Sequence, residues 1–215
     1  LTASTTFPVP ASPFVRIMRT YMMRSFRPHL TLGKALELGC FHGDFTALLV
    51  AEYDDVTVVE AATSFIEIAR QRVSEKVTFV NSLFETYETE KRFDAIFLLH
   101  VLEHLADPVQ VLQKAKQLLT PSGRIFVVVP NGNAISRQIA VKMGVLSHLA
   151  DLSEADLKHH HRRVYCFDTL ERDALAAGLD ILFRGGIFFK PLANFQFDRL
   201  IGSDLINDAF MEGCY

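Results

Sequence analysis

The sequence predicts an α/β fold: a doubly wound, mostly parallel sheet with helices on both faces. Short apolar runs alternate with segments of helical periodicity, and the links between them are short. Such alternation is typical of parallel strands joined by crossover helices. The chain has 215 residues, of which 49% are hydrophobic and 22% are charged. Because these values are typical of a globular domain with a sizeable core, we expect residues 1–215 to form a single domain.

The elements are expected in a regular order along the chain. Residues 14–27 indicate an N-terminal helix, which Pro28 ends. The expected strands are Ala35–Leu38, Val56–Val59, Val77–Val80, Ala95–Leu99, Arg124–Val129 and Leu179–Ile187. The expected later helices are Phe45–Glu52, Ser64–Arg72, Pro108–Leu119, Ala134–Leu146 and Asp168–Ala177.

Several boundaries of these elements have their own signals. Asp107 followed by Pro108 is typical of a helix N-terminus. The run Pro121–Gly123 predicts a turn before the fifth strand. Asp168 is the expected N-cap of the last helix, and Gly178 is its expected C-terminal glycine.

Composition excludes some classes of function. The net charge of −3 argues against a broad electrostatic grip on nucleic acid. Three cysteines without metal-binding spacing indicate a reducing compartment. Because there is also no membrane-length apolar run and no signal-peptide pattern, we expect a cytoplasmic protein with no membrane span. The chain does not begin with Met, so we expect its natural start to lie upstream of Leu1.

The loop after the first strand is the most informative segment. It contains the acid Glu37 and the glycines Gly39 and Gly43. A dinucleotide-binding G-x-G-x-x-G pattern from Gly39 would need glycine at Phe41 and Asp44, so one position of three fits. The pattern acid-x-G-x-G-x-G fits at three positions of four and fails only at Phe41. A bare tight turn is the alternative interpretation.

The second and third strands end in polar residues as well. Glu60 lies 21 residues after Gly39, a placement suited to hydrogen bonds with vicinal ribose hydroxyls. NAD enzymes also use such an acid, and an exposed acid before a helix is the alternative. Asn81 and Ser82, followed by the apolar Leu83, are placed to bind an adenine edge and face, or they form an ordinary loop.

The fourth strand runs into the segment His-Val-Leu-Glu-His-Leu-Ala-Asp-Pro, residues 100–108. Its end should face the same ligand, because ligands of such sheets bind beyond the carboxyl ends of the strands. A backbone carbonyl near His100 can meet an amino group of that ligand. His104 either faces ligand or substrate, or is a hydrogen-bonded structural histidine.

In this order and spacing, the four strand ends resemble those of class I S-adenosylmethionine-dependent methyltransferases. The first loop resembles motif I of that family, and residues 100–108 resemble the HVLEHL-x-DP segment of small-molecule methyltransferases, including the ubiquinone-pathway type. The resemblance covers roughly residues 30–190. It implies a Rossmann-like sheet of seven strands with the last one antiparallel. No clear seventh strand follows Phe189, so we expect that strand to be missing from this chain, which ends at Tyr215.

The resemblance also implies the cofactor and the residues that bind it. The cofactor is S-adenosyl-L-methionine, and the product is S-adenosyl-L-homocysteine. Glycines would let the backbone approach the methionine and ribose closely, and Glu37 would accept hydrogen bonds from the cationic amino-acid end. The expected cofactor-binding residues are Glu37, Gly39, Cys40, Phe41, Gly43, Glu60, Ala61, Asn81, Ser82, Leu83 and His100.

The substrate is expected beneath an insertion at residues 130–167. Apolar residues at helical spacing predict an amphipathic helix there, either a cap over the substrate or a covering helix without a catalytic role. The insertion ends in the basic run Lys158–Arg163. That run is a solvated turn, a site that binds an anionic substrate group, or a metal site. Because adjacent histidines do not easily converge on one ion, we expect no metal.

His104, His160 and His161 are the candidate catalytic residues, as bases that take a proton from the acceptor. The acceptor is expected to be a small molecule, with oxygen, nitrogen and carbon all open as the methylated atom, and not a nucleic acid. Two alternatives stay open. One is a non-catalytic regulatory protein that binds S-adenosylmethionine, and the other is an NAD-linked oxidoreductase, which the missing glycines at Phe41 and Asp44 disfavour.

Overall fold

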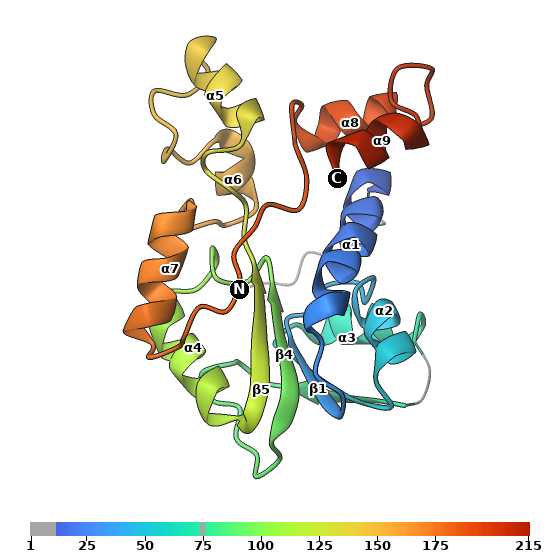
Figure 1. The fold of residues 1–215 in the computed structure, drawn as a ribbon, viewed down its shortest axis with the longest axis vertical. Helices are drawn as coiled ribbons and strands as arrows, with labels where there is room; N and C mark the ends of the chain where they lie inside the picture. Colours follow the sequence, from blue (N-terminus) through green and yellow to red (C-terminus); the bar gives the residue numbers. More distant parts are fainter. Residues whose placement is uncertain (1–11, 74–75) are drawn as a thin grey trace.

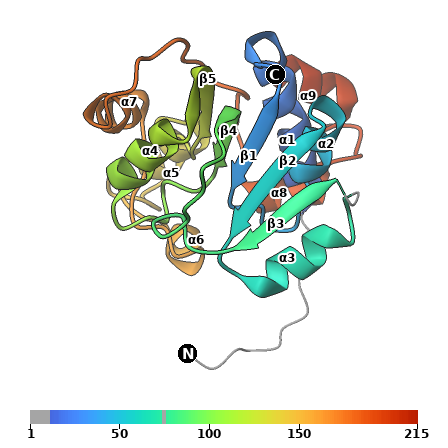
Figure 2. The ribbon, with the colours of Figure 1, turned by 90° about the horizontal axis from the view of Figure 1, so that it is seen from below.

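The structure, a computed structural model, describes residues 12–73 and 76–215, and its centre is a parallel five-stranded sheet. The strand order is β3-β2-β1-β4-β5, as Figure 2 shows from the end of the molecule. All four pairings are parallel, so the predicted α/β fold is confirmed. The strands are β1 (Lys34–Leu38), β2 (Asp55–Glu60), β3 (Val77–Asn81), β4 (Phe93–Leu99) and β5 (Leu119–Val128).

Helices cover both faces of the sheet, and each face has its own apolar core. On one face, α1 (Pro13–Phe26), α2 (Thr46–Glu52) with its N-cap residue, and α3 (Thr63–Arg70) contribute to a cluster with strand residues. The helical side of this cluster includes Met22, Met23, Phe45, Leu49 and Ala69. On the other face, α4 (Pro108–Gln117) and α7 (Phe167–Ala176) frame a cluster that includes Val111, Leu112, Leu118, Tyr165 and Ala177. Because helices cover both faces of the sheet, a ligand is expected to bind at the ends of the strands.

Local sequence signals explain where the helices begin and end. The Ser12 side chain accepts a hydrogen bond from the Val15 N–H and so caps α1, which is followed by the short 3-10 helix η1 (Arg27–His29). Asp107 caps α4 as predicted, since its carboxylate accepts from the Gln110 N–H at 3.0 Å.

The last two expected helix signals have different outcomes. The N-cap of α7 is Cys166, so the expectation that Asp168 caps it is wrong, and Asp168 lies inside its first turn. Gly178 follows α7 with φ +74°, the left-handed conformation expected of a C-terminal glycine. The expected turn at Pro121–Gly123 falls inside the bounds of β5, where the register against β4 shifts.

The predicted sixth strand, residues 179–187, is wrong. The segment has no regular secondary structure, and Ile181, Leu182 and Phe183 are exposed. Two consecutive glycines, Gly185 and Gly186, interrupt it, and such a pair weakens a strand by adding backbone freedom without side chains to pack. No seventh strand forms among the residues that the structure describes.

Instead of further strands, two helices complete the chain. Helices α8 (Asn194–Leu200) and α9 (Asp208–Cys214) pack with α1 beyond the carboxyl end of the sheet (Figure 1). The Phe14 and Phe197 rings stack with centroids 4.4 Å apart inside this third cluster, where both side chains are buried.

The insertion after β5 contains two helices rather than one. Helix α5 (Ile135–Lys142) is shorter than expected, and α6 (Glu154–Lys158) begins with a capping box between Ser153 and Asp156. Figure 1 shows both helices on the opposite side of the strand ends from α8 and α9. The carboxyl ends of the strands therefore lie between two helical segments. None of the described helices combines the length and apolar character that a bilayer-spanning segment needs.

Candidate active site

The site lies where the strand order reverses. The chain proceeds outward from β1 through β2 to β3 and then returns to pair β4 with β1. Parallel sheets bind ligands at such a switch point, beyond the carboxyl ends of the strands. The loops after β1, β2 and β4 meet there.

Glu37, in β1, is an acid enclosed by the protein. Its side chain is 2% exposed, and Thr46 at the start of α2 donates a hydrogen bond of 2.6 Å to Oε2. Burial raises the pKa of Glu37 to about 7, against the opposing effects of Thr46 and the Arg19 guanidinium. The carboxyl group is therefore ready to ionise at neutral pH when a cation approaches.

The loop after β1 is built on left-handed backbone. Gly39 and Gly43 have φ of +84° and +79°, and a Cβ on Gly43 would lie 2.9 Å from Cα of Ala69 in α3. Gly43 therefore lets the loop pack against α3, a structural reason beside the expected approach to a cofactor. Phe41, at the position where the family pattern has glycine, also adopts φ +49°. Its ring stacks on His42 with centroids 3.7 Å apart.

Glu60, at the end of β2, holds this loop in place. Its Oε2 accepts from the N–H groups of Cys40 (3.2 Å) and Phe41 (3.4 Å), and its Oε1 accepts from the N–H of Ala62 (3.0 Å). Oε2 already accepts two hydrogen bonds, whereas Oε1 accepts one and can accept another, as a ribose hydroxyl would require. Cys40 is 5% exposed, and burial raises the pKa of its thiol.

The residues at the end of β3 bond mainly to the protein itself. The Asn81 amide donates to the carbonyls of Glu60 (3.0 Å) and Ala61 (2.8 Å), and the Ser82 hydroxyl donates to the carbonyl of Leu83. Ala61 and Leu83 are exposed beside them. Contact of these residues with adenine stays a prediction.

His100 begins the loop after β4 in a strained conformation. Its φ is +58°, while its N–H still donates to the Val128 carbonyl at 2.8 Å and so extends the pairing with β5. Nδ1 of His100 lies 3.3 Å from Oε1 of Glu103. Burial lowers the pKa of His100, although the neighbouring Glu103 opposes the shift. Strain of this kind is often found at functional sites.

Of the three candidate catalytic histidines, the structure brings two together. The rings of His104 and His161 lie edge to face with centroids 4.8 Å apart. Nδ1 of His161 lies 3.0 Å from Oδ1 of Asp156. His160 is exposed outside this pair, with φ +58°. Lys158 and His159 are exposed as well, so most of the basic run matches the solvated alternative.

Sequence reasoning missed two cations near this site. Arg19 of α1 and Lys190, before α8, both lower the pKa of His100 electrostatically. Burial lowers the pKa of Arg19, and it lowers the pKa of Lys190 to about 8. Neither side chain forms an ion pair among residues 12–73 and 76–215. Arg19 donates to the Met22 sulfur at 3.4 Å, and Nζ of Lys190 lies 5.6 Å from the centroid of the Phe14 ring.

Comparison with known proteins gives the family. A family model of a methyltransferase domain matches residues 15–182, most of the chain. The chain therefore belongs to the methyltransferase-domain family, and its resemblance to class I S-adenosylmethionine-dependent methyltransferases is confirmed.

Curated relatives have methyltransferase names. A ubiquinone biosynthesis O-methyltransferase of Pectobacterium carotovorum is 30% identical over 113 residues, which are 50% of this chain and 47% of the relative. One from Chelativorans is 27% identical over 165 residues, covering 75% of this chain and 64% of the relative. The chain spans about half the length of most of these relatives.

Solved structures share the fold at low identity. The N-methyltransferase NodS of Bradyrhizobium japonicum, in complex with S-adenosyl-L-homocysteine, aligns with a TM-score of 0.56 and 20% identity over 77% of this chain and 76% of that chain. A SAM-dependent methyltransferase of Leishmania major aligns with a TM-score of 0.64 and 19% identity over 84% and 69% of the two chains.

Proposed function

We propose that the chain transfers a methyl group from S-adenosylmethionine to a small-molecule acceptor. The observation that carries this proposal is the pair of acids, Glu37 and Glu60, on either side of the Gly39–Gly43 loop at the carboxyl ends of adjacent strands. Glu37 would accept hydrogen bonds from the cationic amino-acid end of the cofactor, and Glu60 would accept them from the ribose. The family match and the S-adenosyl-L-homocysteine bound in the NodS complex support the same cofactor.

The protein would contribute mainly binding and alignment. When bound, S-adenosylmethionine supplies a methyl group already activated by its sulfonium charge. Placing the acceptor in line behind that group is the step that the protein can accelerate most. Glu37 would hold the cofactor amino group, and Glu60 would hold the ribose while keeping the loop in position through Cys40 and Phe41. Proton removal by His104 or His161 stays a prediction, and the geometry of His160 gives that residue less support.

The acceptor is proposed to carry a negative charge. Arg19 and Lys190 are desolvated cations near His100. Nearby carboxylates act on both cations only electrostatically, and neither cation forms an ion pair among the described residues. An anionic group that binds close to either cation would therefore be favourable. A carboxylate or phosphate on the acceptor has the required chemistry.

Turnover with a metabolite library tests both parts of this proposal. We expect formation of S-adenosyl-L-homocysteine with at least one acidic acceptor. Lys190→Met should raise KM for that acceptor about tenfold, the loss of one charge-assisted hydrogen bond, with a smaller change in kcat. The exposed Lys142 provides the control Lys142→Met, which should leave KM unchanged. Cofactor binding without turnover of any acceptor would favour the regulatory protein over the enzyme. Activity confined to neutral acceptors would contradict the proposal that the acceptor is anionic.

A further inference from the structure

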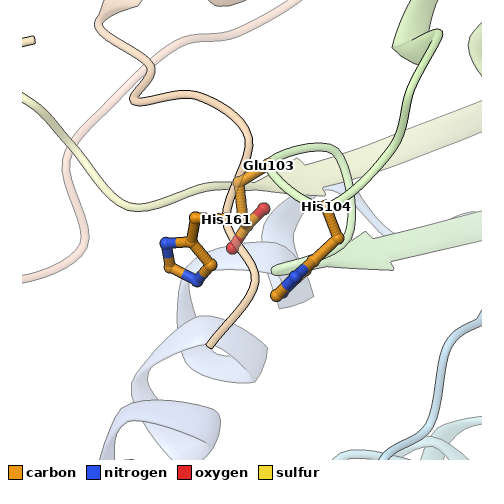
Figure 3. Close-up of side chains that lie close together, drawn as sticks. All are labelled: Glu103, His104 and His161. Atoms are coloured by element: carbon orange, nitrogen blue, oxygen red, sulfur yellow. The ribbon is translucent and has the colours of Figure 1, made fainter. Parts of the chain in front are cut away.

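Three potential metal ligands from two separate segments meet beside the strand ends. Glu103 and His104 belong to the loop after β4, and His161 follows α6 (Figure 3). One ligand atom from each residue can be chosen so that all three lie within 4.8 Å of one another. Only one histidine of the basic run takes part, so the difficulty of converging adjacent histidines on one ion does not arise.

The carboxylate of Glu103 is buried, and Arg19 acts on it only electrostatically. Glu103 is 1% exposed, and neither of its carboxylate oxygens has a hydrogen-bond partner among the residues that the structure describes. His100 Nδ1 approaches Oε1 to 3.3 Å without meeting the geometry of a hydrogen bond. A buried carboxylate of this kind is strongly unfavourable unless a charge or a donor compensates it. A bound cation would supply that charge.

His161 is oriented as metal-binding histidines usually are. Its Nδ1 contacts the carboxylate of Asp156 at 3.0 Å, which leaves Nε2 free to face a ligand. Asp156 is fixed in turn by the Ser153 hydroxyl (2.7 Å) and by the Arg137 guanidinium (3.0 Å). A carboxylate behind the second ring nitrogen fixes the tautomer and increases the basicity of the nitrogen that binds the metal.

We propose that Glu103, His104 and His161 bind one divalent transition-metal ion of the Zn²⁺, Co²⁺ or Mn²⁺ type. Two imidazoles and one carboxylate suit such ions, whereas Mg²⁺ prefers oxygen ligands throughout. Donor atoms about 2.1 Å from one tetrahedral ion lie about 3.4 Å apart, so the cluster must contract on binding. The exposed side chain of His104 has the freedom to make that movement.

The proposed ion would keep an open coordination position. Three protein ligands leave at least one place for water or for an oxygen of another molecule. Since the cluster follows β4 at the switch point, that place would face the acceptor. The orientation of the open position toward the acceptor rests on the proposed function, whereas the metal site itself does not.

Titration of the full chain with Co²⁺ tests the site without any methyl transfer. We expect one ion per chain, with visible absorption bands that indicate four or five ligands, and displacement of Co²⁺ by Zn²⁺ but not by equimolar Mg²⁺. Glu103→Gln and His161→Ala should each weaken binding at least tenfold. Asp156→Asn, which keeps all three metal ligands but weakens the contact that positions His161, should weaken binding by about 10- to 100-fold.

Two controls make the result decisive. His148→Ala removes a histidine outside the cluster and should leave binding unchanged. Zn²⁺ should raise the melting temperature of the unaltered chain but not that of Glu103→Gln, a variant expected to fold because it removes a buried charge. Equal Co²⁺ affinity in Glu103→Gln, His161→Ala and the unaltered chain would overturn the site, as would the absence of binding. Binding of S-adenosyl-L-homocysteine is measured separately. Its result shows whether the proposed methyl transfer fails even where the metal site is present, or the reverse.

Discussion

Replacing Gly43 with alanine should destabilise the protein by about 2–5 kcal/mol. A left-handed conformation costs a residue with a Cβ about 1–2 kcal/mol, and overpacking adds about 1–3 kcal/mol. Gly43 has φ +79°, and the added Cβ would lie 2.9 Å from both Cα and Cβ of Ala69. The backbone of α3 cannot yield as a flexible side chain would. Urea unfolding followed by far-ultraviolet circular dichroism measures the effect.

Gly144 provides a matched control for this prediction. It has φ +73°, but an added Cβ would meet nothing within 4 Å. Gly144→Ala should therefore reduce the free energy of unfolding only by the cost of the left-handed conformation, about 1–2 kcal/mol. The difference between the two variants isolates the contact with α3, and equal losses would show that Gly43 is not required by that packing.

Replacing Glu37 with glutamine should change how stability depends on pH. The folded-state pKa of about 7 is above the ordinary value of 4.5, so the folded chain keeps a proton that the unfolded chain releases between these values. The free energy of unfolding therefore decreases as pH rises from 4.5 to 7, by about 3 kcal/mol in total. Glu37→Gln stays neutral, so this decrease should disappear. The variant should be about 3 kcal/mol more stable than the unaltered chain at pH 8 and nearly equal to it at pH 4.5.

Chemical denaturation at a series of pH values between 4.5 and 8 measures this difference. Glutamine keeps a carbonyl oxygen that can accept the hydrogen bond from Thr46, so packing should change little. Glu67→Gln alters an exposed acid on α3 and should follow the unaltered chain at every pH. If the two curves for Glu37→Gln and the unaltered chain run parallel, Glu37 does not retain a proton in the folded state.

The parts of the fold that local patterns determine could be predicted from the sequence. The first four strands lie within two residues of their expected bounds, because continuous apolar runs mark buried parallel strands. The fifth strand begins five residues earlier than expected, because the residues expected to form a turn belong to it. The α4 N-terminus at Asp107 followed from capping chemistry alone. The expected strand at residues 179–187 failed because its apolar composition resembles a strand, whereas the glycines Gly185 and Gly186 interrupt the segment.

The site residues at the ends of strands could be predicted from the sequence. The site residues that tertiary packing brings in from distant segments could not. Glu37 and Glu60 lie at the ends of neighbouring strands, which topology brings together. Arg19 and Lys190 come from segments far apart in the sequence, and no local pattern distinguishes them from surface cations. Glu103 was visible in the segment His-x-x-Glu-His, but only its burial without a partner distinguishes it from an ordinary helix or loop acid.

Calorimetry of the chain with S-adenosyl-L-homocysteine and with NAD tests the central claim most directly. The proposed function predicts saturable binding of S-adenosyl-L-homocysteine at one site per chain, weakened at least tenfold in Glu60→Ala and unchanged in the exposed-acid variant Glu67→Gln. NAD should not bind under the same conditions. Binding of NAD without binding of S-adenosyl-L-homocysteine would contradict the claim.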